Sequence, residues 1–210
     1  MKKHADSIDA AILGRFRSGK KGRVYAPADF LDLGSRATVD QALLRNCRAG
    51  RIRKIARGLY DVPKKHPVLG TLTASTEAVV LAVARRSGLR LQASGARAAN
   101  ALGLSDQVPL RTVYYSDGRR RSIKIGNASI LLKPAGTRTM AAAGTVSGDV
   151  IQALRWVGRR NVDADTIARL KRNLRRSDKA QLLKDLRFAP AWVADVMRQV
   201  AQSAKKKIHG

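Results

Sequence analysis

Basic and amide side chains recur between residues 35 and 57, at spacings that suit contacts with nucleic acid. Arginine can donate to both acceptors on the major-groove edge of guanine, and glutamine can pair in the same way with adenine. Lysine and arginine also neutralise backbone phosphates. The candidates for DNA contact within residues 35–48 are Ser35, Arg36, Thr38, Gln41, Arg45 and Arg48. The candidates for phosphate contact are Arg53, Lys54 and Arg57, followed in rank by Lys20 and Lys21.

Simpler roles are open to these side chains as well. The polar face of a helix can be merely solvated, and cations on a hairpin can serve solubility. Arg48 lies near the end of a predicted helix, where a cation stabilises the helix dipole and the last carbonyl groups. Strand alternation places Arg53 on the same face as Ile55, so Arg53 can turn inward. We therefore favour Lys54 and Arg57 for the phosphate contacts of the hairpin.

A second group of basic residues could follow nucleic acid or meet an acidic partner surface. It comprises Arg119, Arg120, Arg121 and Lys124, at and beyond the tip of a predicted hairpin. A solvated loop explains this group equally well. Aromatic residues make up only 4% of the chain, which argues against an RNA-binding surface that stacks many bases.

Side chains suited to catalysis or metal binding are few and scattered. The acidic residues comprise 14 Asp and a single Glu, Glu77, and the chain has three His and one Cys. Glu77 falls in the first turn of a predicted helix, where a carboxylate stabilises the helix dipole. Residues 18–22, Ser-Gly-Lys-Lys-Gly, resemble a phosphate-binding loop only faintly, because a helix precedes them and the glycine spacing differs. We predict no catalytic residue, no metal ligand and no cofactor, and we do not expect an enzyme.

The overall charge favours a polyanionic partner. The 210 residues include 42 Lys and Arg against 15 Asp and Glu, a formal net charge of +27. Residues 1–70, 71–150 and 151–210 carry net charges of +10, +7 and +10, so no single tail explains the excess. Such a chain attracts nucleic acid or an anionic membrane surface. We expect a cytoplasmic protein without membrane association, since the sequence has no run of about 20 apolar residues and no apolar N-terminal signal.

The elements that position the first basic group follow from local signals. Apolar residues recur every four positions within residues 8–16, which predicts a first helix. Pro27 suits the first turn of a short second helix. Ser35 suits the N-cap of a third helix that ends at Gly50. Two strand-like runs within residues 52–62 then predict a hairpin.

The order of three helices and a hairpin is typical of a winged helix–turn–helix. We assign residues 1–65 to this domain, and its third helix would enter the major groove. Residues 63–70 contain two prolines and predict an extended linker. Residues 71–210 predict a mixed domain, with helices, a meander of three antiparallel strands turning at 117–118 and 126–127, and C-terminal helices. The predicted fold class is α+β.

Three stretches of the N-terminal domain resemble a known family. Residues 25–35 read Tyr-Ala-Pro-Ala-Asp-Phe-Leu-Asp-Leu-Gly-Ser, residues 39–43 read Val-Asp-Gln-Ala-Leu, and residues 50–60 read Gly-Arg-Ile-Arg-Lys-Ile-Ala-Arg-Gly-Leu-Tyr. They look like the winged-helix domain of AbiEi-type antitoxins, and the last stretch is the most specific. Residues 93–105 and 113–115 are similar, more loosely, to the second domain of the same family.

The resemblance implies a function and two partners. AbiEi-type antitoxins pair with AbiEii-type nucleotidyltransferase toxins in bacterial type IV toxin–antitoxin operons, which are linked to abortive infection. It implies that the N-terminal domain represses its own operon by occupying an inverted repeat of double-stranded DNA in the promoter. It also implies that the second domain counteracts the toxin, directly or indirectly. A winged-helix regulator with no toxin partner stays open as an alternative, and a nucleic-acid-modifying enzyme is the weakest hypothesis.

Overall fold

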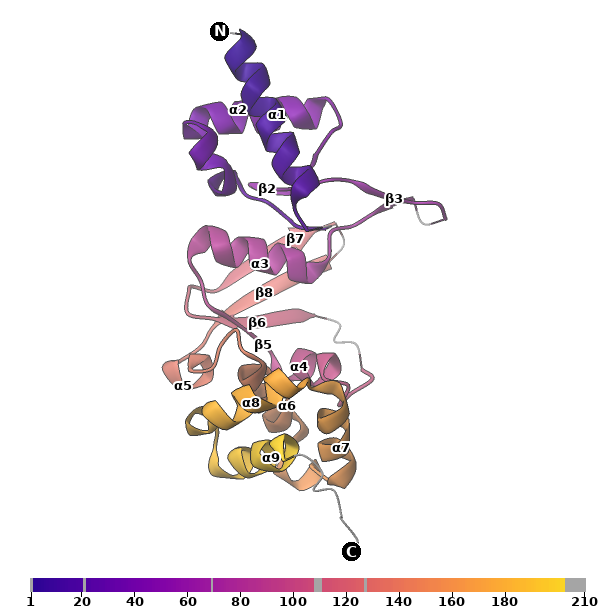
Figure 1. The fold of residues 1–210 in the computed structure, drawn as a ribbon, viewed down its shortest axis with the longest axis vertical. Coiled ribbons are helices and arrows are strands. Elements are labelled where there is room, and N and C mark those ends of the chain that lie inside the picture. The colour runs from indigo at the N-terminus through magenta and orange to yellow at the C-terminus, as the bar shows by residue number, and fades with distance from the viewer. Residues whose placement is uncertain (1, 21, 69, 108–110, 127, 203–210) are drawn as a thin grey trace, which may run out of the picture. The chain divides into compact units, whose positions relative to one another are not determined.

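The computed structural model describes residues 2–20, 22–68, 70–107, 111–126 and 128–202. The chain forms two compact units, whose elements Figure 1 shows. The first unit comprises Met1–Leu89 and Ser122–Ile130, and the second comprises Arg90–Arg121 and Leu131–Gly210. Both units combine helices with strands, so the predicted α+β class is confirmed.

The first unit opens with the helices and the hairpin that local sequence signals predict. The elements are α1 (Lys2–Ser18), the 3-10 helix η1 (Pro27–Leu33), α2 (Arg36–Arg48), β1 (Arg53–Ala56) and β2 (Leu59–Asp61). Ser35 caps α2 as predicted, because its side chain accepts a hydrogen bond of 3.3 Å from the Thr38 backbone N–H. A two-residue turn joins β1 to β2, and Gly58 occupies it with a φ of +65°, which glycine adopts without strain.

Aromatic and aliphatic side chains from α1, η1 and α2 build the core of the first unit. Phe16, Tyr25 and Phe30 form a ring cluster with centroid separations of 4.6, 5.5 and 5.5 Å. Tyr25 also exchanges two backbone hydrogen bonds of 2.8 Å with Tyr60, and these join β2 to the core. The other buried members of the cluster are Ile8, Ile12, Val39, Ala42, Leu43 and Ile52.

A second hairpin occupies the stretch that was predicted to be an extended linker. Strand β3 (Lys64–His66) pairs antiparallel with β4 (Gly70–Leu72), with Lys64 opposite Leu72. The two prolines lie outside the ladder, Pro63 before β3 and Pro67 in the turn, where no backbone N–H is required. The linker prediction was therefore wrong, because a proline at the end of a strand does not prevent pairing.

Helix α3 (Thr76–Ser87) also belongs to the first unit. The Ser75 side chain caps it by accepting the Ala78 backbone N–H at 3.2 Å, and Gly88 ends it in the left-handed conformation. Its buried face carries Val79, Val80 and Val83, as the sequence predicted. The boundary that the sequence placed between residues 65 and 71 thus falls inside this unit.

Four strands form one sheet, and their order differs from the predicted meander. They are β5 (Leu91–Ala93), β6 (Thr112–Ser116), β7 (Arg121–Ile125) and β8 (Ala128–Pro134), in the order β5-β6-β8-β7. Since β8 lies between β6 and β7, the turn at residues 117–118 does not join two paired strands. A turn dipeptide marks where the chain reverses but does not choose the pairing partner. The second predicted turn includes Asn127, which lies outside the described residues.

Strand β5 was not predicted, because three residues are too few to show alternation. It pairs antiparallel with β6, with Leu91 opposite Ser116 and Ala93 opposite Tyr114.

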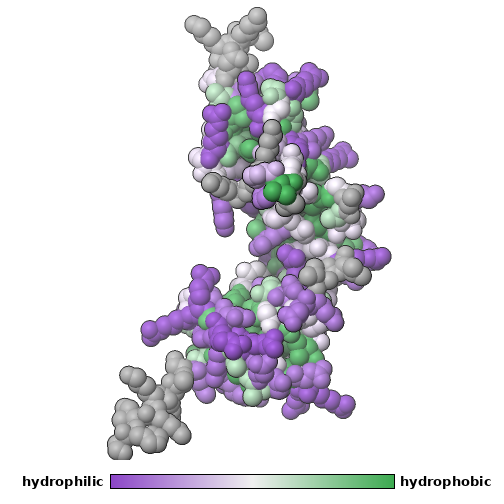
Figure 2. Space-filling view, turned by 90° about the vertical axis from the view of Figure 1, so that its right-hand side faces the viewer, coloured by the Kyte–Doolittle hydropathy of each residue, from purple (hydrophilic) through white to green (hydrophobic). Residues whose placement is uncertain are grey.

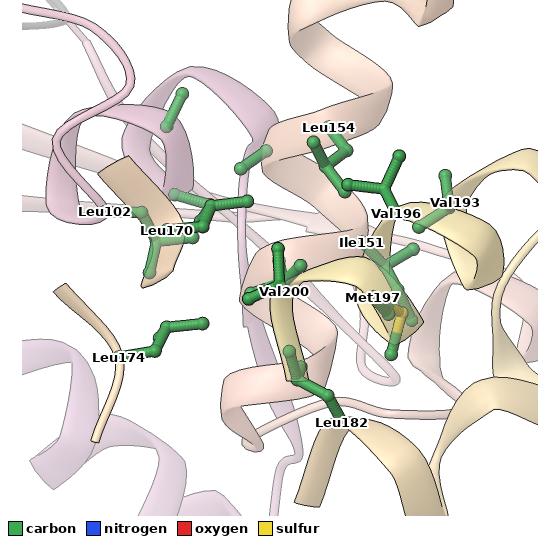
Figure 3. Close-up of a cluster of buried hydrophobic side chains, with 14 of the residues drawn as sticks. Leu102, Ile151, Leu154, Leu170, Leu174, Leu182, Val193, Val196, Met197 and Val200 are labelled. Carbon is green, nitrogen blue, oxygen red and sulfur yellow. The ribbon is translucent and has the colours of Figure 1, made fainter. Parts of the chain in front are cut away.

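Helices around one apolar core make up most of the second unit. They are α4 (Gly95–Ala101), α5 (Thr137–Met140), α6 (Val146–Val157), η2 (Arg159–Asn161), α7 (Ala164–Asn173), α8 (Arg176–Lys184), η3 (Leu186–Phe188) and α9 (Ala191–Ala201). Figure 3 shows Leu154 of α6, Leu170 of α7 and Met197 of α9 among the buried side chains of this core. The predicted C-terminal helices are confirmed, and their apolar stripes meet in a single cluster.

Candidate nucleic-acid interface

Helix α2 presents four of the predicted DNA-contacting residues to solvent. The helix packs its apolar side chains against α1 and η1. Arg36, Gln41, Arg45 and Arg48 are exposed, and Arg36 shows 62% of its side chain to solvent. Hydrophilic side chains cover much of the visible face of each unit in Figure 2. The outward face of α2 is therefore the starting point for an interface with a polyanion.

Ser35 and Thr38 are both engaged at the start of α2. The Ser35 hydroxyl accepts the Thr38 backbone N–H, and the two hydroxyl groups also lie 2.8 Å apart. This pair satisfies a backbone donor that an α-helix leaves open at its first turn. The role shown for Ser35 is thus helix capping, and the prediction that these residues contact DNA stays a prediction.

An ion pair on the exposed face of α2 adds a residue that the sequence analysis left out of the site. The Arg36 Nε donates to a carboxylate oxygen of Asp40 at 2.8 Å, one helical turn away. Both side chains are well exposed, so the pair is held weakly and can open. A carboxylate on this face repels phosphates but can accept a hydrogen bond from cytosine. The i, i+4 spacing of Arg36 and Asp40 was visible in the sequence.

Arg45 joins α2 to α1 through an ion pair, and 42% of its side chain remains exposed. Its guanidinium donates two hydrogen bonds to the Asp9 carboxylate, from Nε at 2.9 Å and from Nη2 at 2.7 Å. The Asp9 side chain is 13% exposed. Such a bidentate pair orients the guanidinium toward α1. Arg45 therefore differs from Gln41 and Arg48, for which the described structure gives no comparable internal partner.

Arg53 is turned inward and pairs with a carboxylate of the same chain, so the structure shows it in a structural role and not as a free cation of the hairpin. Its guanidinium donates to both carboxylate oxygens of Asp61, at 3.0 and 2.7 Å, and to the Leu72 carbonyl oxygen at 3.0 Å. The hydrogen bonds that Arg53 donates to Asp61 raise the pKa of Arg53. The Asp61 side chain is only 6% exposed, so Arg53 supplies the charge that a buried carboxylate needs. Arg53 thus braces β1, β2 and β4.

Lys54 and Arg57 are the exposed cations of the β1–β2 hairpin. Lys54 lies opposite Tyr60 in the ladder, and Arg57 is in the turn.

Burial raises the pKa of the Cys47 thiol, and the nearby Lys54 charge acts in the opposite direction. The net upward shift keeps Cys47 a neutral thiol, so it acts as a small packing residue and not as a nucleophile.

Two arginines of α3 hold the hairpin and the loop before η1, and sequence reasoning assigned them no role. The Arg86 guanidinium donates to the carbonyl oxygens of Arg57 and Gly58, at 2.9 and 3.4 Å. Arg85 donates to the Val24 carbonyl at 2.7 Å. These contacts fix the turn of the hairpin from the side of its backbone. No local signal could have found them, because donor and acceptor lie at least 28 residues apart.

The remaining candidates come from separate stretches of the chain. Lys20 is exposed after α1, and Lys21 lies outside the described residues. The exposed residues Arg119 and Arg120 lie in the connection between β6 and β7. Alternation along β7 places Arg121 with the buried Ile123 and Ile125, and Lys124 on the opposite face. Arg121 and Lys124 are both exposed, and the prediction that this group meets nucleic acid or an acidic partner stays a prediction.

No group of three or more His, Cys, Asp or Glu side chains in the described ranges could hold a metal ion. Over those same ranges, no helix is both long and apolar enough to cross a membrane.

The described chain is a mixed α+β protein in which α2 and the β1–β2 hairpin present exposed polar residues. Comparison with known sequences places the chain in a family. It belongs to DUF6088, a family of unknown function, whose sequence profile matches residues 11–182. Among solved structures, the chain is similar to the RV2827C protein from Mycobacterium tuberculosis, with 11% sequence identity and a TM-score of 0.42. That match covers 94% of this chain and 83% of the other. No curated protein matches the sequence.

Proposed function

We propose that the first unit contains a winged helix–turn–helix that binds double-stranded DNA, and that the protein represses transcription of its own operon. One observation carries the proposal: α2 presents exposed Arg36 and Gln41, and the hairpin that follows presents exposed Lys54 and Arg57. A helix for the major groove followed by a basic hairpin is the arrangement that such proteins use on DNA. The net charge of +27 adds long-range attraction to phosphates.

In this proposal α2 reads bases and the hairpin supplies affinity. Gln41 pairs with adenine, and Arg36 pairs with guanine once it leaves Asp40. Lys54 and Arg57 bind phosphates, which strengthens binding to every sequence alike. Occupation of an inverted repeat in the promoter then blocks RNA polymerase sterically. Arg45 and Arg53 support the surface from within through their carboxylate partners.

Gel-shift titrations with the DNA upstream of the gene test this surface. Gln41→Ala should weaken specific binding by about 1–3 kcal/mol. Lys54→Ala should reduce the slope of log K against log salt concentration by about one, since one phosphate contact is lost. Arg17→Ala removes an exposed cation of α1 and is the matched control, which should change neither quantity. Unchanged binding by all three variants would remove the proposed surface.

We also propose, from the resemblance to AbiEi-type antitoxins, that the same operon encodes a nucleotidyltransferase toxin. The second unit would counteract this toxin, directly or indirectly. The adjacent open reading frame decides between this role and a regulator without a toxin. If that frame encodes a nucleotidyltransferase, its expression alone should arrest growth, and co-expression of the full chain should restore it. Growth arrest that persists on co-expression would contradict the antitoxin role.

A further inference from the structure

A cavity of about 550 Å³ lies in the first unit beside the β1–β2 hairpin. Its walls come from the loop after α1, the end of β2, the stretch from β4 to α3, and α3 itself. All of these segments fall within Met1–Leu89. The volume lies within the range of sites that bind small organic molecules, roughly 300–1,000 Å³.

Part of the cavity wall is apolar and incompletely covered. Val24 is fully buried, whereas Leu81 is 50% exposed and Val62 is 40% exposed. Leu72 is half-buried at the same cavity. An apolar group placed there would cover these side chains and remove their surface from water.

Two cations on the cavity have no carboxylate partner among the described residues. They are Lys20 and Arg23, and the Arg23 guanidinium is steadied over the Tyr25 ring at 4.8 Å. Two other charged residues of the wall, Asp61 and Arg85, have partners of opposite charge. Asp61 pairs with Arg53, and Arg85 lies 3.8 Å from Asp29.

Glu77 is the exception among the acidic groups of the wall. It lies in the first turn of α3 and forms no ion pair with another described residue. An anion in the cavity would therefore be attracted by Lys20 and Arg23 and repelled by Glu77.

We propose that this cavity binds a small amphiphilic anion, with an aromatic or branched apolar body and one carboxylate or phosphate group. The apolar body lies against Leu81 and Val62, and the anionic group lies at Lys20 and Arg23. We further propose that this ligand changes the affinity of the protein for DNA, and this regulatory part rests on the proposed function.

The hydrogen bonds of Arg53 connect the cavity to the hairpin that we propose binds DNA. Asp61 and Leu72 both line the cavity, and both accept hydrogen bonds from Arg53 of β1. Lys54 follows Arg53 directly in the same strand. A ligand that prefers one position of Asp61 or Leu72 therefore favours one position of the hairpin.

Calorimetric titration of the full chain with phenyl phosphate tests the site, with benzyl alcohol as the neutral probe of similar size. Phenyl phosphate should bind, and benzyl alcohol should bind at least fivefold more weakly, about the effect of one exposed charge contact. Lys20→Gln should weaken phenyl phosphate binding, Glu77→Gln should tighten it, and Arg17→Gln should leave it unchanged. Equal binding of both probes, no binding at millimolar concentration, or weaker binding by Glu77→Gln would overturn the proposal.

A second titration separates the site from the proposed function. Gel shifts are measured on the upstream DNA with and without saturating phenyl phosphate. We expect phenyl phosphate to change the DNA affinity severalfold. Ala78→Trp fills the cavity and should abolish this change. Anion binding by a protein that binds no DNA would keep the site and remove the proposed function. DNA binding that phenyl phosphate leaves unchanged would overturn the regulatory part.

Discussion

Replacing Arg53 by methionine distinguishes a brace of the fold from a DNA-contacting side chain. Arg53 makes two hydrogen bonds to Asp61 and one to the Leu72 carbonyl, all between 2.7 and 3.0 Å. In Arg53→Met, the Asp61 carboxylate stays buried and loses its cation, and the carbonyl loses a donor. We therefore expect Arg53→Met to lower the free energy of unfolding, although the sequence alone suggested a phosphate contact for Arg53.

The size of this loss follows from burial. Removing one partner of a fully buried ion pair costs about 3–5 kcal/mol. The Arg53 side chain is 30% exposed, so water already screens the pair in part, and we expect a loss of about 2–3 kcal/mol. Replacing both partners, in Arg53→Met with Asp61→Leu, should recover most of this loss, because no buried charge is left.

Urea unfolding followed by circular dichroism measures the change, with Lys54→Met as the matched control. Lys54 is the neighbouring exposed cation, so its replacement should alter the free energy of unfolding by less than about 0.5 kcal/mol. Gel shifts at several salt concentrations complete the comparison. The reasoning would be refuted if Arg53→Met were as stable as Lys54→Met and lowered the salt slope of DNA binding instead.

Three further substitutions test the packing and the helix caps. Gly148→Ala should destabilise the second unit by about 3 kcal/mol, because the new Cβ would lie 2.2 Å from the Ala142 carbonyl oxygen. Thermal unfolding measures this loss, and Gly136→Ala is the control because Gly136 has open space around it. Ser35→Ala should cost about 1 kcal/mol through the lost cap, which hydrogen exchange at the start of α2 would report. Hydrogen bonds from Thr166 lower the pKa of Asp163, so its stabilising effect is present above the unfolded pKa and lost as pH falls through the folded pKa. Asp163→Asn should therefore weaken the acid dependence of stability below about pH 4, as pH-dependent unfolding would show.

Local signals predicted the helices well because the forces that start and end a helix act over a few residues. Ser35 and Ser75 cap α2 and α3 with their own side chains, and Gly58 takes the turn that its missing Cβ permits. The pairing of strands was predicted less well. Hydrophobic alternation identified β6, β7 and β8, but their order depends on contacts between segments that are distant in sequence.

For the candidate site, too, local features could be predicted from the sequence and long-range contacts could not. Exposed polar positions of α2 followed from helical periodicity, and Arg36, Gln41 and Arg48 lie where it placed them. Whether an arginine faces solvent or a carboxylate of the same chain could not be deduced. Arg45 meets Asp9 across 36 residues, which is a contact between two packed helices.

By itself the sequence determined the order of the elements within residues 1–62, the apolar stripes of the C-terminal helices and the charge that favours a polyanionic partner. Only the tertiary structure decided which cations remain available to that partner. The reason is that a guanidinium binds whichever carboxylate or carbonyl the fold brings within about 3 Å, and that choice depends on long-range packing. Packing therefore paired Arg45 and Arg53 with carboxylates of the same chain, bound Arg86 to the hairpin turn, and left Lys54 and Arg57 exposed without an ion pair to another described residue.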